Sequence, residues 1–183
     1  MIYLIGGAPR AGKSILAQRL CTTLKVGWIS TDLLMVLLKV KGATGIKVKW
    51  DASPEAITAN AEWFFPYLER FIWGVSSLTD NYVIEGVDFL PAQVAQLSTQ
   101  YPIRMVFLGC SSMTLEHFDQ FPGLSKGYSG LPEALRRQIV QDVPHWSAFI
   151  RQEAERLGYA YVDMADDFSQ RQAEAEIILT SRV

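Results

Sequence analysis

A glycine-rich segment near the amino end of the chain, residues 7–14 with the sequence GAPRAGKS, constrains the fold more than any other feature. It follows an apolar run at residues 2–5 and precedes a stretch whose apolar residues recur every three or four positions. The spacing G-x-x-x-x-G-K-S is that of a loop whose backbone N–H groups surround a phosphate chain at the start of a helix. The sequence therefore predicts a strand, a phosphate-binding loop and a helix, in that order.

The residue types in this loop fit the binding of a nucleotide. Gly7 and Gly12 permit backbone angles and close approaches that a side chain would prevent. Lys13 can reach the β- and γ-phosphates, and the Ser14 hydroxyl can ligate Mg²⁺. The residues predicted to bind the nucleotide are Gly7, Ala8, Pro9, Arg10, Ala11, Gly12, Lys13, Ser14 and Ile15.

The bulk composition predicts one globular domain over residues 1–183, because 49% of the 183 residues are hydrophobic and 20% are charged. The net charge of −2 provides no electrostatic reason to expect a nucleic acid or a membrane as partner. The two cysteines have no C-x-x-C or Cys/His neighbours, so neither zinc nor a disulfide framework is indicated. We expect a cytoplasmic protein without a signal peptide or membrane span, of unknown oligomeric state.

Short apolar segments alternate with helical patterns along the whole chain. Further strands are predicted near residues 26–30, 82–86, 103–109 and 160–164. The expected fold class is a three-layer α/β/α P-loop NTPase with a five-stranded parallel sheet and a small lid. Ligands bind beyond the carboxyl ends of such strands, which puts residues 7–14, 32 and 85–88 at one edge of the molecule.

Local signals predict where several segments begin and end. Thr31 or Asp32 is expected to cap the helix that follows the second strand, and Ser53 the helix that begins at Pro54. Pro66 should kink that second helix or split it in two. The basic stretch 39–49 is interpreted as an exposed loop or hairpin, and the glycine-rich stretch 122–132 as the lid.

Three segments together resemble a known family: residues 6–14 (GGAPRAGKS), 29–33 (ISTDL) and 83–87 (VIEGV). They are similar to the small-molecule P-loop kinases, in particular the 2-phosphoglycerate kinase-like, chloramphenicol phosphotransferase-like and zeta-toxin-like members. The resemblance implies a nucleoside-monophosphate-kinase-like fold, ATP and Mg²⁺, and transfer of the γ-phosphate to a hydroxyl. It does not identify the small-molecule acceptor.

The resemblance also implies roles for two acids. An aspartate just after the second strand of these kinases orients the acceptor hydroxyl and accepts its proton, and Asp32 matches it; helix capping is the alternative role. Glu85 stands where many P-loop proteins carry the second acid of the magnesium site, although aspartate is commoner there. It is predicted to hold Mg²⁺ or the acceptor, with an ordinary ion pair as the alternative and Asp88 as the substitute for either role.

A closing lid usually supplies arginines that neutralise charge on the transferred group. The stretch 122–132 contains Lys126 but no arginine. Arg136 and Arg137 are therefore the predicted catalytic arginines beside Lys13 and Asp32, with Arg10 as a further candidate. Ordinary surface charges are the alternative.

The acceptor pocket is predicted on one helix face, where an amide, two aromatic rings and a guanidinium follow at steps of three, four and three. These residues are Asn60, Trp63, Tyr67 and Arg70, which join Asp32 and Glu85 as predicted substrate contacts. Packing in the core or against a partner is the alternative. Lysines 39, 41, 47 and 49 would hold an anionic acceptor or, alternatively, belong to a solvated loop.

Other functions are compatible with the same loop. An adenylate-kinase-like enzyme would share the fold, but a carboxylate at Asp32 would repel a phosphate acceptor and favours a hydroxyl. A nucleotide-binding regulatory protein with little turnover would bind ATP without needing Asp32. A GTPase is disfavoured because no N-K-x-D-like segment is found, and a toxin-like or nucleic-acid-end kinase is disfavoured by the acidic balance.

Overall fold

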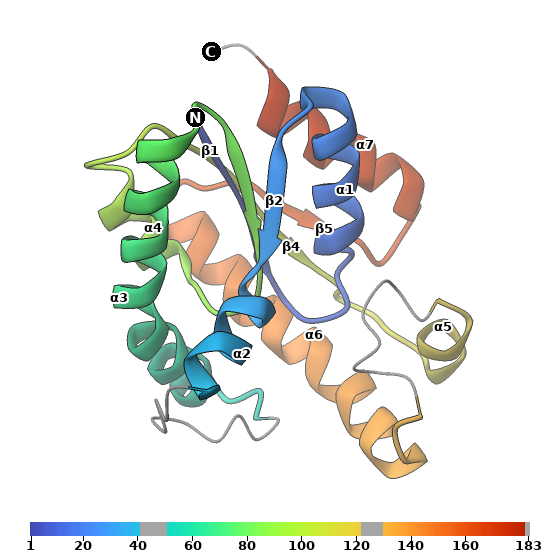
Figure 1. The fold of residues 1–183 in the computed structure, drawn as a ribbon. Helices are drawn as coiled ribbons and strands as arrows, with labels where there is room; N and C mark the ends of the chain where they lie inside the picture. The colour runs from blue at the N-terminus through green and yellow to red at the C-terminus, as the bar shows by residue number, and fades with distance from the viewer. Residues whose placement is uncertain (41–50, 122–129, 182–183) are drawn as a thin grey trace.

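The computed structural model describes residues 1–40, 51–121 and 130–181. In these ranges the chain forms a parallel sheet of five strands in the order β2-β3-β1-β4-β5 (Figure 1). The strands are β1 (Ile2–Gly7), β2 (Gly27–Ser30), β3 (Tyr82–Glu85), β4 (Ile103–Gly109) and β5 (Tyr161–Asp163). The predicted α/β class and the five parallel strands are thereby confirmed.

Helices cover both faces of the sheet. α3, α4 and α6 lie on one face, and α1 and α7 lie on the other (Figure 1). The helices are α1 (Lys13–Leu24), α2 (Thr31–Val40), α3 (Pro54–Leu78), α4 (Pro91–Leu97), α5 (Leu115–Gln120), α6 (Glu133–Arg156) and α7 (Phe168–Thr180). No helix within residues 1–40, 51–121 and 130–181 combines the length and the apolar character that a membrane crossing needs.

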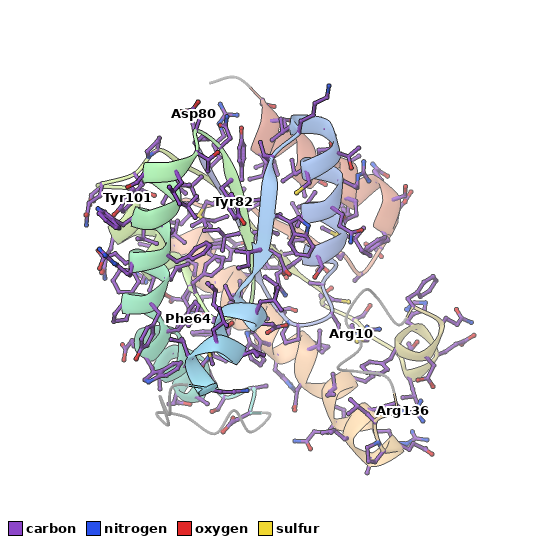
Figure 2. The ribbon with its side chains drawn as sticks, viewed as in Figure 1. Arg10, Phe64, Asp80, Tyr82, Tyr101 and Arg136 are labelled. Carbon is purple, nitrogen blue, oxygen red and sulfur yellow. The ribbon has the colours of Figure 1, made fainter. Side chains whose placement is uncertain are left out.

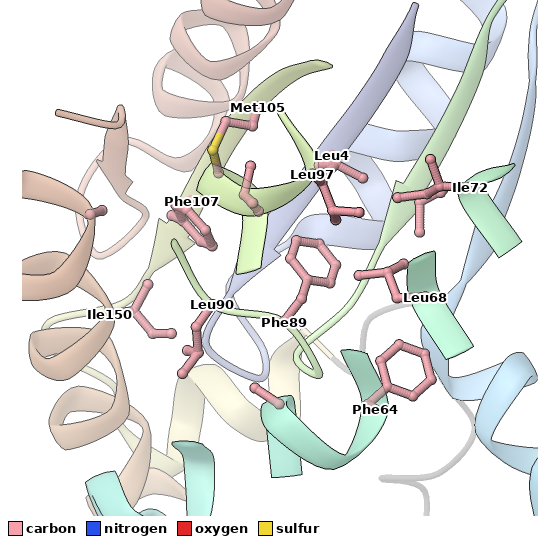
Figure 3. Packing of buried hydrophobic residues seen from close by; sticks show 14 of the residues in the cluster. Leu4, Phe64, Leu68, Ile72, Phe89, Leu90, Leu97, Met105, Phe107 and Ile150 are labelled. Atoms are coloured by element: carbon pink, nitrogen blue, oxygen red, sulfur yellow. The ribbon is translucent and has the colours of Figure 1, made fainter. Parts of the chain in front are cut away.

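The strands are apolar on both sides because each face of the sheet has its own core. In β1, Leu4 packs toward α3 and α4, while its neighbour Ile5 packs toward α1 and α7. The larger core contains the fully buried rings of Phe64, Phe89 and Phe107 (Figure 3). These two cores hold β1 rigidly between its neighbours and so fix the loop that follows it.

The chain reverses its direction across the sheet at β1. The helix after β1 leads to β2 at one edge, whereas β4 and β5 lie on the other side of β1. At such a switch point the connections on the two sides of a strand diverge and leave a crevice beyond its carboxyl end. The glycine-rich loop lies at this point, between β1 and α1.

One local prediction was wrong. α2 begins at Thr31, and the Ser30 hydroxyl accepts a hydrogen bond from the Asp32 N–H at 3.3 Å, so neither Thr31 nor Asp32 is the cap. α3 runs unbroken through Pro66, which is exposed, so the proline does not split the helix, and a kink there stays a prediction. The predicted cap at Ser53 is confirmed, since its side chain accepts from the Ala56 N–H at 3.3 Å.

Two predicted segments cannot be compared with the structure. Residues 41–50, which include most of the basic stretch 39–49, lie outside the described residues. The same holds for residues 122–129, which make up most of the predicted lid and contain Lys126.

Candidate functional site

The glycine-rich loop has the backbone that its sequence predicts. Gly7, Arg10 and Gly12 all have positive φ, at 129°, 64° and 80°. A methyl group at Gly7 would overlap the Leu108 carbonyl oxygen and come within 2.6 Å of the Leu108 nitrogen. That carbonyl accepts a hydrogen bond from the Ala8 N–H at 2.9 Å, so the end of β4 supports the loop only where residue 7 lacks a side chain.

Lys13 is the first residue of α1, and its side chain lies inside the loop. Its ammonium donates to the Ala8 carbonyl at 2.7 Å, and only 7% of the residue is exposed. Burial lowers the pKa of Lys13, whereas the charges of Glu85, Asp32 and Asp88 raise it. Three carboxylates are therefore close enough to act electrostatically on this one cation.

Glu85 ends β3 next to the loop and is 3% exposed. The Ser14 hydroxyl donates to Glu85 Oε1 at 3.1 Å. Burial raises the pKa of Glu85, while Lys13 and hydrogen bonds with Ser30 and Ser14 oppose the shift. The strand register brings Ser30 to this carboxylate, since Ser30 of β2 pairs with Glu85 of β3.

The residues at this point fit a magnesium ion. A hydroxyl and a carboxylate are the hard oxygen ligands that Mg²⁺ prefers, and Mg²⁺ usually keeps water or phosphate oxygens in its remaining positions. Within the described ranges no group of three or more His, Cys, Asp or Glu side chains could hold a metal by itself. Ser14 and Glu85 would supply two of the ligands of such an ion.

Asp32 lies in the exposed first turn of α2, directly after β2. Its charge acts on Lys13, Glu85 and Asp88, so the carboxylate belongs to the same cluster. The arrangement follows from the sheet, because the carboxyl ends of β1, β2 and β3 meet at one edge.

A second buried carboxylate, Asp88, joins three elements. Thr31 Oγ1 donates to Asp88 Oδ2, and Asn60 Nδ2 donates to Asp88 Oδ1 at 2.9 Å. Asp88 is 4% exposed, and Thr31 is fully buried. Sequence analysis named Asp88 only as a substitute for Glu85 and missed the role of Thr31, because no local pattern connects residues that lie so far apart in the chain.

The other predicted acceptor residues lie further along α3. Trp63 contacts Tyr67 with ring centroids 5.2 Å apart, and the Arg70 guanidinium stacks 3.9 Å from the centre of the Trp73 ring. Ten residues of helix span about 15 Å, so α3 carries Arg70 away from Asn60 by roughly that distance. Of the four predicted residues, the structure joins only Asn60 to the carboxylate cluster.

Two of the predicted arginines converge on α5. The Arg10 guanidinium donates to the carbonyls of Phe118, at 3.0 Å, and Phe121, and it lies 4.5 Å from the centre of the Phe118 ring. Arg136 of α6, labelled with Arg10 in Figure 2, pairs with Asp119 of α5. Arg137 instead pairs with Glu133 on the exposed surface of α6.

One residue that supports the loop has no signal in the sequence. Gln172 of α7 is 1% exposed and donates from Nε2 to the Gly12 carbonyl at 3.2 Å. The two residues are 160 positions apart, so only the packing of α7 against α1 brings them together. Gln172 thus holds the end of the loop at the point where α1 begins.

Comparisons with known proteins identify the fold. No protein-family model matches the chain, and no curated protein matches its sequence. A sugar kinase from Janibacter sp. HTCC2649 is 12% identical with a TM-score of 0.55, over 97% of this chain and 92% of that one. Shikimate kinase from Bacteroides thetaiotaomicron is 15% identical with a TM-score of 0.53, over 97% and 94% of the two chains. An uncharacterized protein from Eubacterium ventriosum ATCC 27560 is 14% identical with a TM-score of 0.53, over 100% and 99%.

The fold and the loop together define an α/β P-loop protein. Within that class, the chain has the fold of the small-molecule P-loop kinases over nearly its whole length.

Proposed function

We propose that this protein is an ATP-dependent phosphotransferase that moves the γ-phosphate of ATP to a hydroxyl group of a small molecule. The proposal depends mainly on one observation: the glycine-rich loop holds a buried lysine, and its Ser14 hydroxyl donates to the buried carboxylate of Glu85 at the same sheet edge. The fold shared with a sugar kinase and shikimate kinase supports it, since both enzymes are named for hydroxyl-bearing substrates.

The charges of the site favour a nucleotide that binds with its metal. The charges of Glu85, Asp32 and Asp88 all act on Lys13, so this group of four is net negative when all of its members are ionised. ATP without a metal would be repelled by this field, whereas a divalent cation at Ser14 and Glu85 would balance it. Magnesium, when bound there, would neutralise charge on the phosphates.

The groups of the chain have distinct roles in this reaction. The backbone N–H groups of the loop and the Lys13 ammonium orient and stabilise the phosphates. Asp32 accepts the proton of the acceptor hydroxyl. At the same time the hydroxyl oxygen bonds to the γ-phosphorus, and the bond between the γ-phosphorus and the β-phosphate oxygen breaks. ADP leaves, and the phosphate ester remains on the acceptor. Arg136 and Arg137 stay predictions for charge neutralisation, because both pair with carboxylates of the protein in this structure.

A screen for acceptors tests the proposal. The purified protein is incubated with Mg·ATP and a panel of sugars, polyols, hydroxy acids and nucleosides, and ADP release is measured. The proposal requires a hydroxyl-bearing compound that accelerates ADP release and becomes phosphorylated. Phosphorylation of a nucleoside monophosphate instead would indicate an adenylate-kinase-like enzyme.

Two variants separate binding from transfer. Lys13→Ala is expected to abolish ATP-dependent activity while the fold is retained. Asp32→Asn is expected to bind Mg·ATP normally and to transfer phosphate roughly 100-fold more slowly, the scale of a lost general base. Titration calorimetry measures the affinity of both variants for Mg·ATP. Undiminished transfer by Asp32→Asn would contradict the role of Asp32, and ATP binding without any acceptor would favour a regulatory protein.

A further inference from the structure

We infer that Asp88 is a positioning residue, which ties Thr31 and Asn60 to the end of β3 and thereby sets the place of Asp32. This inference rests on the proposed function, because the purpose of the arrangement is to present Asp32 to an acceptor. It assigns a role to a buried carboxylate that the phosphate-binding loop itself does not need.

The contacts of Asp88 account for both of its oxygen atoms. Thr31 Oγ1 donates to one oxygen and Asn60 Nδ2 donates to the other. Burial raises the pKa of Asp88, and these two hydrogen bonds oppose the shift. Removal of either donor would leave a carboxylate oxygen buried without its partner, which is a costly change.

Thr31 has almost no freedom to move. It is fully buried, and a methyl group at Gly86 would overlap its hydroxyl oxygen. The hydroxyl is therefore confined between Gly86 and Asp88. Asp32 is the next residue along the chain, so its backbone position depends directly on that of Thr31.

The rest of α2 contacts the protein core along one side only. Met35 is buried, whereas Leu33, Val36 and Leu37 are all more than half exposed. Leu34 and Leu38 pack partly buried against the core on the same side. The first turn has two polar contacts, the exposed bond from the Asp32 N–H to Ser30 and the buried bond from Thr31 to Asp88, and the buried one is the anchor. Asn60 extends the same anchor to α3, so one carboxylate joins the start of α2 to the second turn of α3.

Hydrogen exchange tests this inference without any ligand. We compare wild-type protein with Thr31→Val, which removes the hydroxyl at nearly constant volume, and Thr31→Ser, which keeps it. Amides of residues 31–36 should exchange about tenfold faster in Thr31→Val, the scale of one lost hydrogen bond to a charged group. Thr31→Ser should stay near wild type. Asp80→Asn removes an exposed carboxylate at the opposite end of the sheet and should change nothing (Figure 2).

Kinetics test the connection with Asp32. With the acceptor from the screen, or with water as acceptor in slow ATP hydrolysis, Thr31→Val should lower kcat about tenfold and leave the KM for Mg·ATP within about twofold, because a small displacement of a catalytic group costs rate. Thr31→Ser should restore kcat. Asp88→Asn should behave like Thr31→Val if it folds.

The outcomes separate the two proposals. Unchanged amide exchange of residues 31–36 in Thr31→Val would overturn the inference. A loss of Mg·ATP affinity as large as the loss of kcat would also overturn it, because the bonds to Asp88 would then serve the nucleotide site. Failure of the wild-type protein to bind Mg·ATP would instead contradict the proposed function, and the exchange measurement would still report whether Asp88 anchors α2.

Discussion

Replacement of Gly86 by alanine would place a methyl group against Thr31. Besides the hydroxyl oxygen, the new carbon would meet Thr31 Cβ and Cγ2 at 2.7 Å, where ordinary contact begins at 3.4 Å. The carbon contacts alone require the two segments to separate by about 0.7 Å (3.4 − 2.7), and the hydroxyl oxygen, which would lie closer still, requires more. Cores resist overpacking of this kind. Thr31 cannot turn away, because it is fully buried and bonded to Asp88.

The expected effects follow from this displacement. Overpacking of a buried site costs about 1–3 kcal/mol, so the free energy of unfolding should fall by that amount. Phosphate transfer should fall roughly 10- to 100-fold, because displacement of a catalytic group by about 1 Å can cost 100-fold in rate. Affinity for Mg·ATP should fall by less than the rate of transfer, since Gly86 adjoins Glu85 but does not belong to the phosphate-binding loop.

A second glycine provides the matched control. Gly74 lies within α3, and a methyl group there would meet no atom within 4 Å. Because alanine favours helix, Gly74→Ala should raise the free energy of unfolding by about 0.5–1 kcal/mol. Both variants are measured by urea unfolding, followed by circular dichroism, and by ADP release. If Gly86→Ala unfolds at the wild-type urea concentration with normal transfer, the packing of Thr31 does not control Asp32.

Three further outcomes are expected. Phe64→Ala should lower the free energy of unfolding by about 3–5 kcal/mol in urea titration, since the ring is fully buried, and a loss below about 1 kcal/mol would contradict this packing. Burial raises the pKa of Asp163, but hydrogen bonds from Ser111 and Ala165 outweigh burial and bring this pKa below its usual value. The stability from this carboxylate is therefore present above about pH 4 and lost as the pH falls further, so Asp163→Asn should lower Tm at pH 7 but not at about pH 2.5. Burial, followed by the charge of Asp163, raises the pKa of Cys110 to about 11. In the native protein at pH 8 it should react with a thiol reagent roughly 200-fold more slowly than a small thiol, and reaction at full rate without denaturant would refute this.

The fold could be predicted where the determining pattern was local. Apolar runs bounded by polar residues located all five strands, and the glycine-rich loop located the first strand–helix junction. The wrong prediction at the start of α2 has a tertiary cause. The hydroxyl of Thr31, which would have suited a cap, is occupied by Asp88 from a segment 57 residues away.

The candidate site divides along the same line. Lys13, Ser14, Glu85 and Asp32 could be brought together from the sequence, because parallel strands place their carboxyl ends at one edge and motif spacing fixes the positions. The bonds from Asn60 to Asp88 and from Gln172 to Gly12 depend on how α3 and α7 pack, which no periodicity in the sequence encodes. In the sequence pattern Arg70 lies on the same helix face as Asn60. That face runs along the axis of α3, however, and carries Arg70 away from the site.

The distribution of buried charge distinguishes this edge from the rest of the molecule. In residues 1–40, 51–121 and 130–181, the buried lysine, aspartate and glutamate side chains are Lys13, Glu85 and Asp88. Each buried charge costs several kcal/mol of desolvation, which a neighbouring opposite charge offsets only in part, and apolar residues of similar volume are often more stabilising. One lysine cannot balance the two buried carboxylates, and the charge of the exposed Asp32 adds to theirs. The arrangement is therefore not the one that maximises the stability of the ligand-free protein. The excess negative charge of this edge is complementary to a divalent cation, and the N–H groups of the loop are complementary to a phosphate chain. A metal-bound nucleotide would supply both partners at once.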